Sequence, residues 1–274
     1  MKSFKDKQIL VTGAASGIGQ ATAMASAREG AHLWLSDLNE QGLSETADMI
    51  RQSGGSAQTL TCDVADADAV QAMAAKVHEK NEALDILVNN AGIGSAGRFL
   101  DVSLDTWHKV MDVNLMGVVH GCQAFLPAMV KRGQGGHVVN TASAASFLAS
   151  PEMPVYAASK FAVLGLSESL RADMANHDIG VSAICPGIIN TSIVRNTIME
   201  GAMGQGDVQS KVVQFYEKRN YSADHVAEAI LKAVRRNIAV QPVSPEAWGM
   251  YLGKRLMPGL VGRLTQRELP FLKQ

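Results

Sequence analysis

Short apolar runs alternate with longer amphipathic segments along the whole chain. Seven runs have the length and composition of buried strands: residues 8–11, 31–36, 57–61, 84–88, 136–141, 180–185 and 238–241. Between them, apolar residues recur at helical spacing, most clearly at residues 43–50, 70–77, 107–130 and 155–174. Strands that are apolar on both faces and separated by helices predict a seven-stranded parallel sheet with helices on both faces. This is the doubly wound (Rossmann) α/β fold.

The alternation continues without an internal repeat or a linker, so we expect a single domain over residues 1–243. A glycine- and methionine-rich stretch at residues 199–206 interrupts it, within an expected substrate loop at about 192–218. Residues 244–274 form a C-terminal appendage, where Trp248, Tyr251 and Leu252 begin an amphipathic pattern with basic residues between them. Such a segment can lie on a membrane surface, but we expect it to pack against its own body or a second subunit.

Composition narrows the class of protein. A net charge of -1 over 274 residues gives no electrostatic basis for binding nucleic acid. The cysteines Cys62, Cys122 and Cys185 lie far apart in apolar surroundings, which indicates reduced, buried thiols, and the histidines have no metal-ligand spacing. No stretch approaches the roughly 18 uninterrupted apolar residues of a transmembrane helix, and residues 1–7 lack the apolar core of a signal peptide. We therefore expect a cytoplasmic enzyme without a metal.

A glycine-rich loop follows the first predicted strand and opens a helix. The loop, TGAASGIG at residues 12–19, includes Gly13, Gly17 and Gly19. Glycines in this place allow a tight turn and let backbone N–H groups approach a pyrophosphate at the helix N-terminus. Asp37 ends the second strand about 20 residues further on, where a carboxylate accepts hydrogen bonds from the ribose hydroxyls of NAD. The same carboxylate would repel the 2′-phosphate of NADP, and the neighbouring Ser16 and Leu38 supply no positive charge. NAD is therefore the expected cofactor.

Candidate chemistry centres on Tyr156 and Lys160, which are four residues apart on one face of a predicted helix, with Ser143 at the end of the fifth strand. A phenol has a pKa near 10 and is a poor base at neutral pH. An ammonium about 4 Å away contributes ~4 kcal/mol at an effective dielectric constant of 20, or roughly 3 pK units. We therefore expect Lys160, together with a bound cationic nicotinamide, to bring the pKa of Tyr156 near 7. Tyr156 would then act as the general acid/base, with Ser143 holding the substrate oxygen.

In these motifs the chain resembles the short-chain dehydrogenase/reductase family over about residues 5–240. The resemblance implies that Asn114 holds a water in a proton relay toward Lys160, and that the family's dimers or tetramers form through the helices carrying Asn114 and Tyr156. It also implies cofactor contacts from Gly13, Ser16, Gly17, Ile18, Gly19, Asp37, Leu38, Asp63, Val64, Asn90, Ala91, Gly92, Tyr156, Lys160, Pro186, Gly187, Ile189 and Thr191. The C-terminal segment resembles dehydrogenase modules that are fused to epoxide-hydrolase domains.

The residues that follow the motifs predict the substrate pocket. Ile93, Phe147 and Met153, with Ser143 and Tyr156, are expected to contact the substrate. These side chains and the methionines of the loop favour an apolar secondary alcohol or its ketone. Two other functions stay open: a carbonyl reductase that prefers NADP(H), and a catalytically silent dinucleotide-binding regulator. The second should have lost Ser143, Tyr156 or Lys160, and all three are present.

Overall fold

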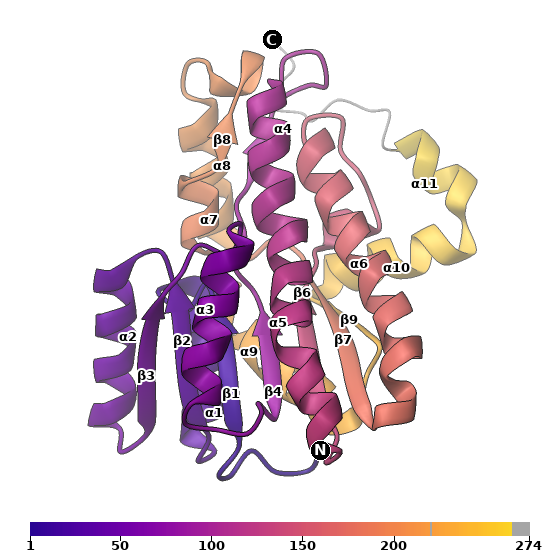
Figure 1. Ribbon diagram of the computed structural model, residues 1–274. Helices are drawn as coiled ribbons and strands as arrows, with labels where there is room; N and C mark the ends of the chain where they lie inside the picture. Colours follow the sequence, from indigo (N-terminus) through magenta and orange to yellow (C-terminus); the bar gives the residue numbers. More distant parts are fainter. Residues whose placement is uncertain (220, 265–274) are drawn as a thin grey trace.

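A seven-stranded parallel sheet forms the centre of the computed structural model, which describes residues 1–219 and 221–264 (Figure 1). Across the sheet the strands are β3 (Ser56–Thr61), β2 (His32–Asp37), β1 (Gln8–Thr12), β4 (Ile86–Asn89), β6 (Gly136–Thr141), β7 (Ile179–Pro186) and β9 (Val240–Val243). The doubly wound fold and its seven predicted strands are confirmed, with the last strand at 240–243 instead of 238–241. The strand order reverses between β1 and β4, which opens a crevice at the carboxyl edge of the sheet.

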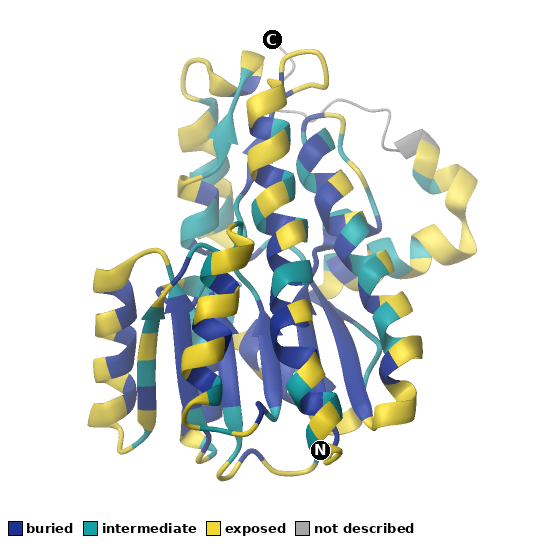
Figure 2. Cartoon of the chain, viewed as in Figure 1, coloured by how far each residue is buried: buried dark blue, intermediate teal, exposed yellow. Residues whose placement is uncertain are grey.

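Helices bury both faces of this sheet, which is why its strands are apolar on both sides. One face is covered by α1 (Gly17–Arg28), α2 (Glu40–Gln52) and α9 (Ala223–Arg236). The other is covered by α3 (Ala67–His78), α5 (Gly117–Arg132) and α6 (Pro154–Met174). Figure 2 shows the central strands of the sheet buried and the helices that cover them exposed mainly on their outer faces, whereas the edge strand β3 is partly exposed. The three cysteines are free and buried, as expected.

The helix predicted at 107–130 is present and contains a π-helical turn that the sequence did not indicate. It consists of α4 (Leu104–Met111), the π-helical turn at Asp112–Met116 and α5, which together run without a break from Leu104 to Arg132. The buried side chain of Asn114 lies within the π turn and bonds to the backbone of Ile93. The run Leu104–Arg132 is, among the described residues, the one segment long and apolar enough to cross a membrane; half of its most apolar window is buried in the fold. Core helices of soluble proteins have the same composition.

The expected substrate loop contains more regular structure than its sequence indicates. It includes α7 (Ser192–Arg195), β8 (Ile198–Met199), a 3-10 turn at Gly201–Gly204 and α8 (Val208–Arg219). β8 pairs in parallel with β5 (Ser95–Ala96) in a small second sheet. Neither two-residue strand was predicted, and their pairing ties the loop to the segment that follows β4.

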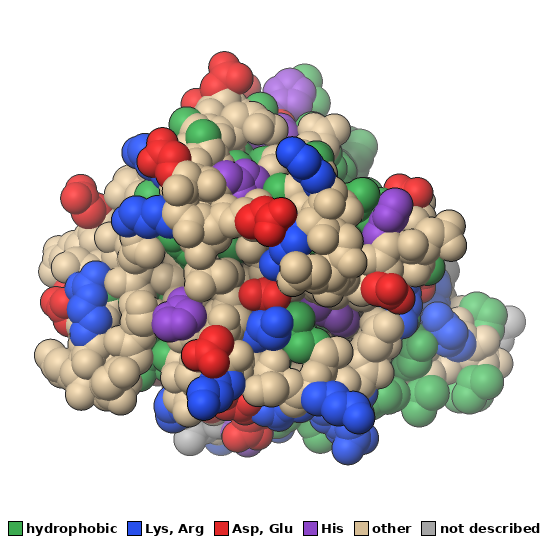
Figure 3. All heavy atoms as spheres, turned by 60° about the horizontal axis from the view of Figure 1, so that its bottom comes forward, with side chains coloured by type: hydrophobic (Ala, Val, Ile, Leu, Met, Phe, Trp, Pro, Cys, Tyr) green, Lys and Arg blue, Asp and Glu red, His purple; other side chains and the backbone are tan. Residues whose placement is uncertain are grey.

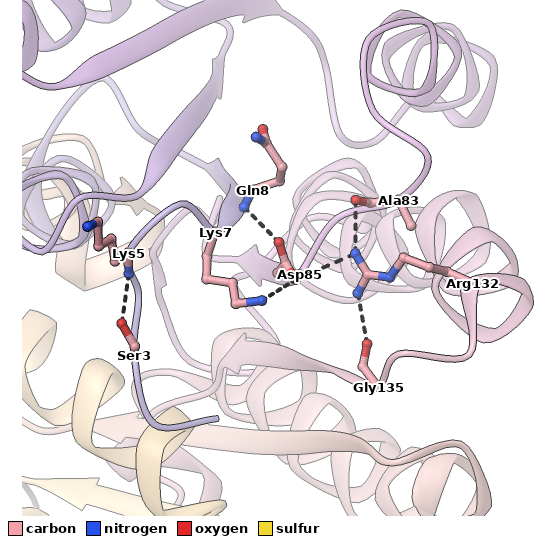
Figure 4. Close-up of polar contacts among 8 residues, drawn as sticks. All are labelled: Ser3, Lys5, Lys7, Gln8, Ala83, Asp85, Arg132 and Gly135. Carbon is pink, nitrogen blue, oxygen red and sulfur yellow. Dashed lines mark hydrogen bonds and ion pairs between the residues drawn. The ribbon is translucent and has the colours of Figure 1, made fainter.

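A partly buried ion-pair cluster stabilises the opposite, amino edge of the main sheet (Figure 4). The Asp85 carboxylate accepts hydrogen bonds from Lys7 Nζ at 3.0 Å and from the Gln8 backbone N–H at 2.9 Å. Arg132, at the end of α5, lies 3.5 Å from the same carboxylate and donates to the Gly135 carbonyl at 2.9 Å. The cluster joins β1, β4 and α5 on the side of the sheet away from the crevice.

The C-terminal segment packs one face on the body of the protein and exposes the other. It forms α10 (Pro245–Leu256) and α11 (Pro258–Leu264); residues 265–274, part of the predicted appendage, lie outside the described residues. The ring of Tyr251 lies 5.0 Å from that of Phe147, whereas Trp248, Leu252 and Leu260 are exposed. Figure 3 shows hydrophobic side chains gathered at this edge, while acidic and basic side chains intersperse over the rest of that face.

Candidate active site

A cavity of about 1340 Å³ lies at the carboxyl edge of the sheet, where the strand order reverses. The loops after β1, β4, β6 and β7 form its floor, and the segment around α7 and α8 covers it. Most of the predicted site residues line this cavity; the exceptions are Gly19, Asn114 and Phe147. Among the described residues, no group of three or more His, Cys, Asp or Glu side chains is arranged to hold a metal ion.

The glycine loop is held tightly against the end of β4. Gly13 has φ +66°, and a Cβ there would lie 2.9 Å from Ala91 Cα, so a side chain would be both strained and crowded. Asn90 Nδ2 donates to the Thr12 carbonyl at 3.0 Å, which pins the loop to β4. At Gly19 a Cβ would lie 2.1 Å from the Gly13 carbonyl oxygen. Gly19 therefore acts through close packing below the cavity rather than by lining it.

The N-terminus of α1 faces the cavity, and its N-cap residue makes no side-chain hydrogen bond to the first N–H groups of the helix. Helices α2, α3 and α4 are capped by the side chains of Asn39, Asp66 and Ser103. Ser16, in the same position of α1, makes no capping bond, and its hydroxyl pairs with that of Ser192 at 2.8 Å. The first N–H groups of α1 therefore keep their capacity to bind an anion.

Asp37 and Asp63 lie further along the same cavity. Asp37 Oδ2 accepts the Ala15 N–H at 3.1 Å and Oδ1 accepts the Asn39 N–H at 3.0 Å, which fixes the carboxylate beside the glycine loop. Each carboxylate oxygen keeps a lone pair for a further donor. Asp63 Oδ1 accepts the Ala65 N–H at 2.9 Å. The cavity is also lined here by Leu38 and Val64, and by Ile18, Ala91 and Gly92 nearer the centre.

Ser143, Tyr156 and Lys160 meet on the floor of the cavity. Ser143 follows β6 and caps a 3-10 turn at Ala144–Ser146, where its Oγ accepts the Ala145 N–H at 3.1 Å. Tyr156 and Lys160 come from the first two turns of α6, and Lys160 is only 4% exposed. Lys160 Nζ donates to the Thr141 carbonyl at 2.9 Å and lies 5.8 Å from the centroid of the Tyr156 ring.

The expected lowering of the Tyr156 pKa is absent from the protein without ligands. Burial raises the pKa of Tyr156 to about 12, although a hydrogen bond with Ser143 acts in the opposite direction. Burial also lowers the pKa of Lys160 to about 8. The Lys160 ammonium donates to the Thr141 carbonyl in this state, and the lowering of the phenol pKa by Lys160 together with a bound nicotinamide stays a prediction.

Asn114 lies beneath the cavity floor with every polar atom of its side chain bonded to protein. Its Oδ1 accepts the Ile93 N–H at 2.8 Å, while Nδ2 donates to the Ile93 carbonyl at 3.0 Å and to Ser159 Oγ at 3.1 Å. These bonds hold the segment that follows Gly92 in place. The water relay that the family resemblance implies for Asn114 stays a prediction.

The loop after β7 brings Pro186, Gly187, Ile189 and Thr191 to the cavity, as expected. A residue that was not predicted from the sequence, Glu246, holds this loop in place. Glu246 Oε1, from the first turn of α10, accepts the Ile188 N–H at 3.0 Å, and Oε2 pairs with Arg219 at the end of α8. Burial acts to raise the pKa of Glu246, but its own N–H, that of Ile188 and other donors including Arg219 outweigh burial and hold the pKa below its usual value.

The substrate end of the cavity is largely apolar. Ile93 and Met153 line it, but Phe147 does not: its ring is buried in the core against Tyr251, so we remove it from the expected substrate contacts. The segment over the cavity, which lies within the predicted substrate loop at about 192–218, adds further apolar side chains: Ile193, Val194, Met199, Met203, Val212 and Phe215. Tyr216 from α8 is the second phenol in the cavity, and burial raises its pKa.

Together, the fold and this arrangement define a dinucleotide-binding oxidoreductase. The model of the short chain dehydrogenase family matches residues 7–200. The Mycobacterium tuberculosis protein EphD, named as an oxidoreductase, is 42% identical over 265 residues, which cover 93% of this chain and 44% of EphD. SadH from the same organism, likewise named as an oxidoreductase, is 34% identical over 269 residues, 97% of this chain and 96% of SadH. The chain thus spans less than half the length of the first of these relatives and nearly all of the second.

Solved structures agree with the family assignment. A short chain dehydrogenase/reductase from Burkholderia phymatum, determined in complex with NAD, is similar with a TM-score of 0.85 and 30% identity over 98% of both chains. This chain belongs to the short-chain dehydrogenase/reductase family.

Proposed function

We propose that this protein transfers hydride between NAD and an apolar secondary alcohol or its ketone, with Tyr156 as the general acid/base. The observation that carries the proposal is the convergence of Ser143, Tyr156 and Lys160 on the cavity that the glycine loop and Asp37 also line. We propose the same division of the chain as before, with the oxidoreductase domain at 1–243 and the appendage at 244–274.

The residues present fit a nicotinamide dinucleotide. The uncapped N-terminus of α1 suits the pyrophosphate, since Gly17 and Ile18 line the cavity there. Asp37, already oriented by two backbone N–H groups, suits the ribose hydroxyls of NAD and disfavours a 2′-phosphate. Asp63 and Val64 suit the adenine end, and the loop of Pro186, Gly187, Ile189 and Thr191 the nicotinamide end. NAD, the ligand in the Burkholderia protein, is our preferred cofactor.

The chain's own groups would manage the proton and the position of the substrate. When bound, NAD supplies the hydride acceptor and a positive charge close to the phenol. Ser143 Oγ holds the substrate oxygen as a hydrogen-bond partner, and Tyr156 takes the hydroxyl proton during oxidation or returns it during reduction. Asn114 bonds to Ile93 at the substrate end and to Ser159 on the helix of Tyr156, and so keeps these two parts of the site in position. Asn114 is thus a positioning residue in this proposal.

The high pKa of Tyr156 in the free protein implies that the cofactor binds before the proton is transferred. A phenol with a pKa of about 12 stays protonated at neutral pH, which prevents it from acting as a base before the cofactor arrives. Lys160, with a pKa of about 8, still carries most of its charge at pH 7. The cation of the bound cofactor and Lys160 together would lower the phenol pKa, so proton transfer is coupled to cofactor binding.

The apolar lining supports an apolar substrate. Met153, Met199 and Met203 offer flexible, polarisable surfaces around the reacting end, and Ile93 and Phe215 extend them. Turnover restricted to short, highly polar polyols would contradict this part of the proposal.

The carbonyl reductase that prefers NADP(H) remains the second candidate, and Asp37 argues against it. Comparing kcat/KM with the two cofactors separates these functions. A catalytically silent regulator is disfavoured because Ser143, Tyr156 and Lys160 are all present and share one cavity. We also propose a cytoplasmic homodimer or homotetramer that does not bind nucleic acid and does not span a membrane. Sedimentation velocity of the full chain measures the assembly.

The test is a panel of secondary alcohols with NAD, followed by the absorbance of the reduced nicotinamide. Wild-type protein should turn over at least one apolar member of the panel, and Tyr156→Phe should lose at least about 100-fold in kcat. NADH binding to both proteins, measured by fluorescence, is the control for folding. Wild-type turnover by the Phe variant would show that Tyr156 is not the acid/base.

A further inference from the structure

A carboxylate is buried in the wall of the otherwise apolar substrate end. Glu152 lies four residues before Tyr156, in the segment that leads into α6, and is 1% exposed. Its backbone carbonyl accepts the Gly97 N–H at 2.7 Å, which places it directly beside the end of β5. The residue lines the cavity together with Ser150 and Met153.

The two oxygens of this carboxylate differ in their partners. Oε2 accepts a short hydrogen bond from Ser150 Oγ, whereas Oε1 is buried and has no hydrogen-bond partner. The described residues include no Lys, Arg or His in an ion pair with Glu152. A buried carboxylate oxygen without a donor is costly and rare in proteins, so the position calls for a donor that comes from outside the chain.

A purely structural role does not explain why residue 152 is a glutamate. The Gly97 contact uses only the backbone of Glu152, and Ser150 satisfies only one of its carboxylate oxygens. A methionine or leucine would fill the same wall without burying an unpaired oxygen. In contrast, a carboxylate beside the reacting centre can select a substrate, because it rejects molecules that cannot offer it a donor.

We propose that Glu152 is a specificity-determining residue whose Oε1 accepts a hydrogen bond from a second hydroxyl group of the substrate. The inference rests on the proposed function and narrows its substrate class to an apolar secondary alcohol that carries a further hydroxyl on its skeleton. The reacting oxygen lies between Ser143 and Tyr156, and the second hydroxyl reaches the wall at Glu152. An ammonium group offers the same hydrogen-bond donor and is distinguished experimentally.

The experiment compares 2-octanol with octanediols that keep the hydroxyl at carbon 2 and place a second one on successive carbons. The corresponding amino-alcohols form a separate arm. With NAD and wild-type protein, we expect at least one diol to exceed 2-octanol by about 10- to 100-fold in kcat/KM, the range for a hydrogen bond to a charged group. A preference for the amino-alcohols over every diol would overturn the assignment to a hydroxyl. No turnover of any member, 2-octanol included, would contradict the proposed function instead.

Glu152→Met is the decisive variant, and Glu168→Met, at an exposed position of α6, is its matched control. The ratio of kcat/KM for the preferred diol over 2-octanol should fall to about 1 in the first variant and stay at its wild-type value in the second. Loss of the unpaired oxygen should also raise the melting temperature of the ligand-free Glu152→Met protein.

Equal kcat/KM for 2-octanol and every diol in wild type would overturn the proposal. So would an unchanged diol preference in Glu152→Met, or a lower melting temperature with equal losses on all substrates, which is the result of a purely structural role. If Glu152→Met does not fold, Glu152→Gln keeps the volume and one acceptor oxygen. This variant should then retain part of the preference, because its hydrogen bond to the diol lacks the charge.

Discussion

Replacing Lys160 by methionine should make the ligand-free protein more stable at neutral pH while it abolishes turnover. Burial lowers the pKa of Lys160 from 10.5 to about 8, so holding the charged ammonium in the fold costs about 3 kcal/mol at pH 7. Removing it leaves the Thr141 carbonyl without its donor, a loss of about 1 kcal/mol. Methionine has a similar length and no charge, so Lys160→Met should gain about 2 kcal/mol in the free energy of unfolding.

The pH dependence of this stability difference shows whether the buried charge of Lys160 causes it. Between about pH 8 and pH 10.5 the folded protein binds fewer protons at Lys160 than the unfolded chain does. Wild-type stability therefore rises with pH across this window relative to the variant. The advantage of Lys160→Met should be present in full below about pH 8 and should decline through this window. Near pH 10.5 the variant should be less stable than wild type by about 1 kcal/mol, because only the lost bond to Thr141 remains.

Urea unfolding of both proteins without NAD, at equal concentration and at pH 7 and pH 10, measures this difference. Lys76→Met, at an exposed position of α3, controls for the loss of a lysine and should change stability by no more than about 0.5 kcal/mol. A Lys160→Met protein that is less stable than wild type at pH 7 would refute the reasoning. A stability difference that does not change with pH would refute it equally.

Three further predictions concern the cofactor. Asp37→Ser combined with Leu38→Arg should shift the ratio of kcat/KM for NAD over NADP by at least about 100-fold, because it exchanges the repelling carboxylate for a cation; Leu38→Gln is the control. Gly19→Ala should abolish NADH binding in a fluorescence titration, because its Cβ would lie 2.1 Å from the Gly13 carbonyl oxygen, while Gly165→Ala, where nothing lies within 4 Å, should bind normally. Glu246→Gln should raise the KM for NAD by about 10-fold and speed proteolysis within α8, since it weakens the bonds to Ile188 and Arg219; an unchanged KM would separate the C-terminal helix from cofactor binding.

Several parts of the fold could be predicted because their signals are local. Each strand of the central sheet is an apolar run bounded by turn residues, and the glycine loop follows the first run directly. Motif spacing also placed Ser143, Tyr156, Lys160 and Asp37 around what proved to be one cavity. Parallel strands with carboxyl ends at the same edge make that convergence a consequence of the fold.

The remaining features depend on contacts between distant residues. β5 and β8 contain two residues each, too few to show any periodicity, and they form only because residues 95–96 meet residues 198–199. Phe147 lies close after Ser143 in the sequence, yet its ring packs against Tyr251 from α10 in the core. The pKa of Tyr156 is raised in the ligand-free protein because the phenol is buried, and residue spacing does not show how deeply a side chain is buried.

Two stretches of sequence enclose the cavity. The small sheet of β5 and β8 and the bond from Glu246 to Ile188 hold the later stretch against the earlier one. The family model ends at residue 200, whereas Met203, Phe215, Tyr216 and Glu246 enclose the cavity from beyond that point. The substrate end is therefore enclosed from two distant stretches of sequence, with Ile93, Glu152 and Met153 on one side of residue 200 and Met203 and Phe215 on the other. A chimera that grafts the segment from residue 192 onward onto a relative of the same family should keep the recipient's cofactor preference. It should acquire only the part of this protein's substrate range that the later stretch sets, because Glu152, Ile93 and Met153 stay behind.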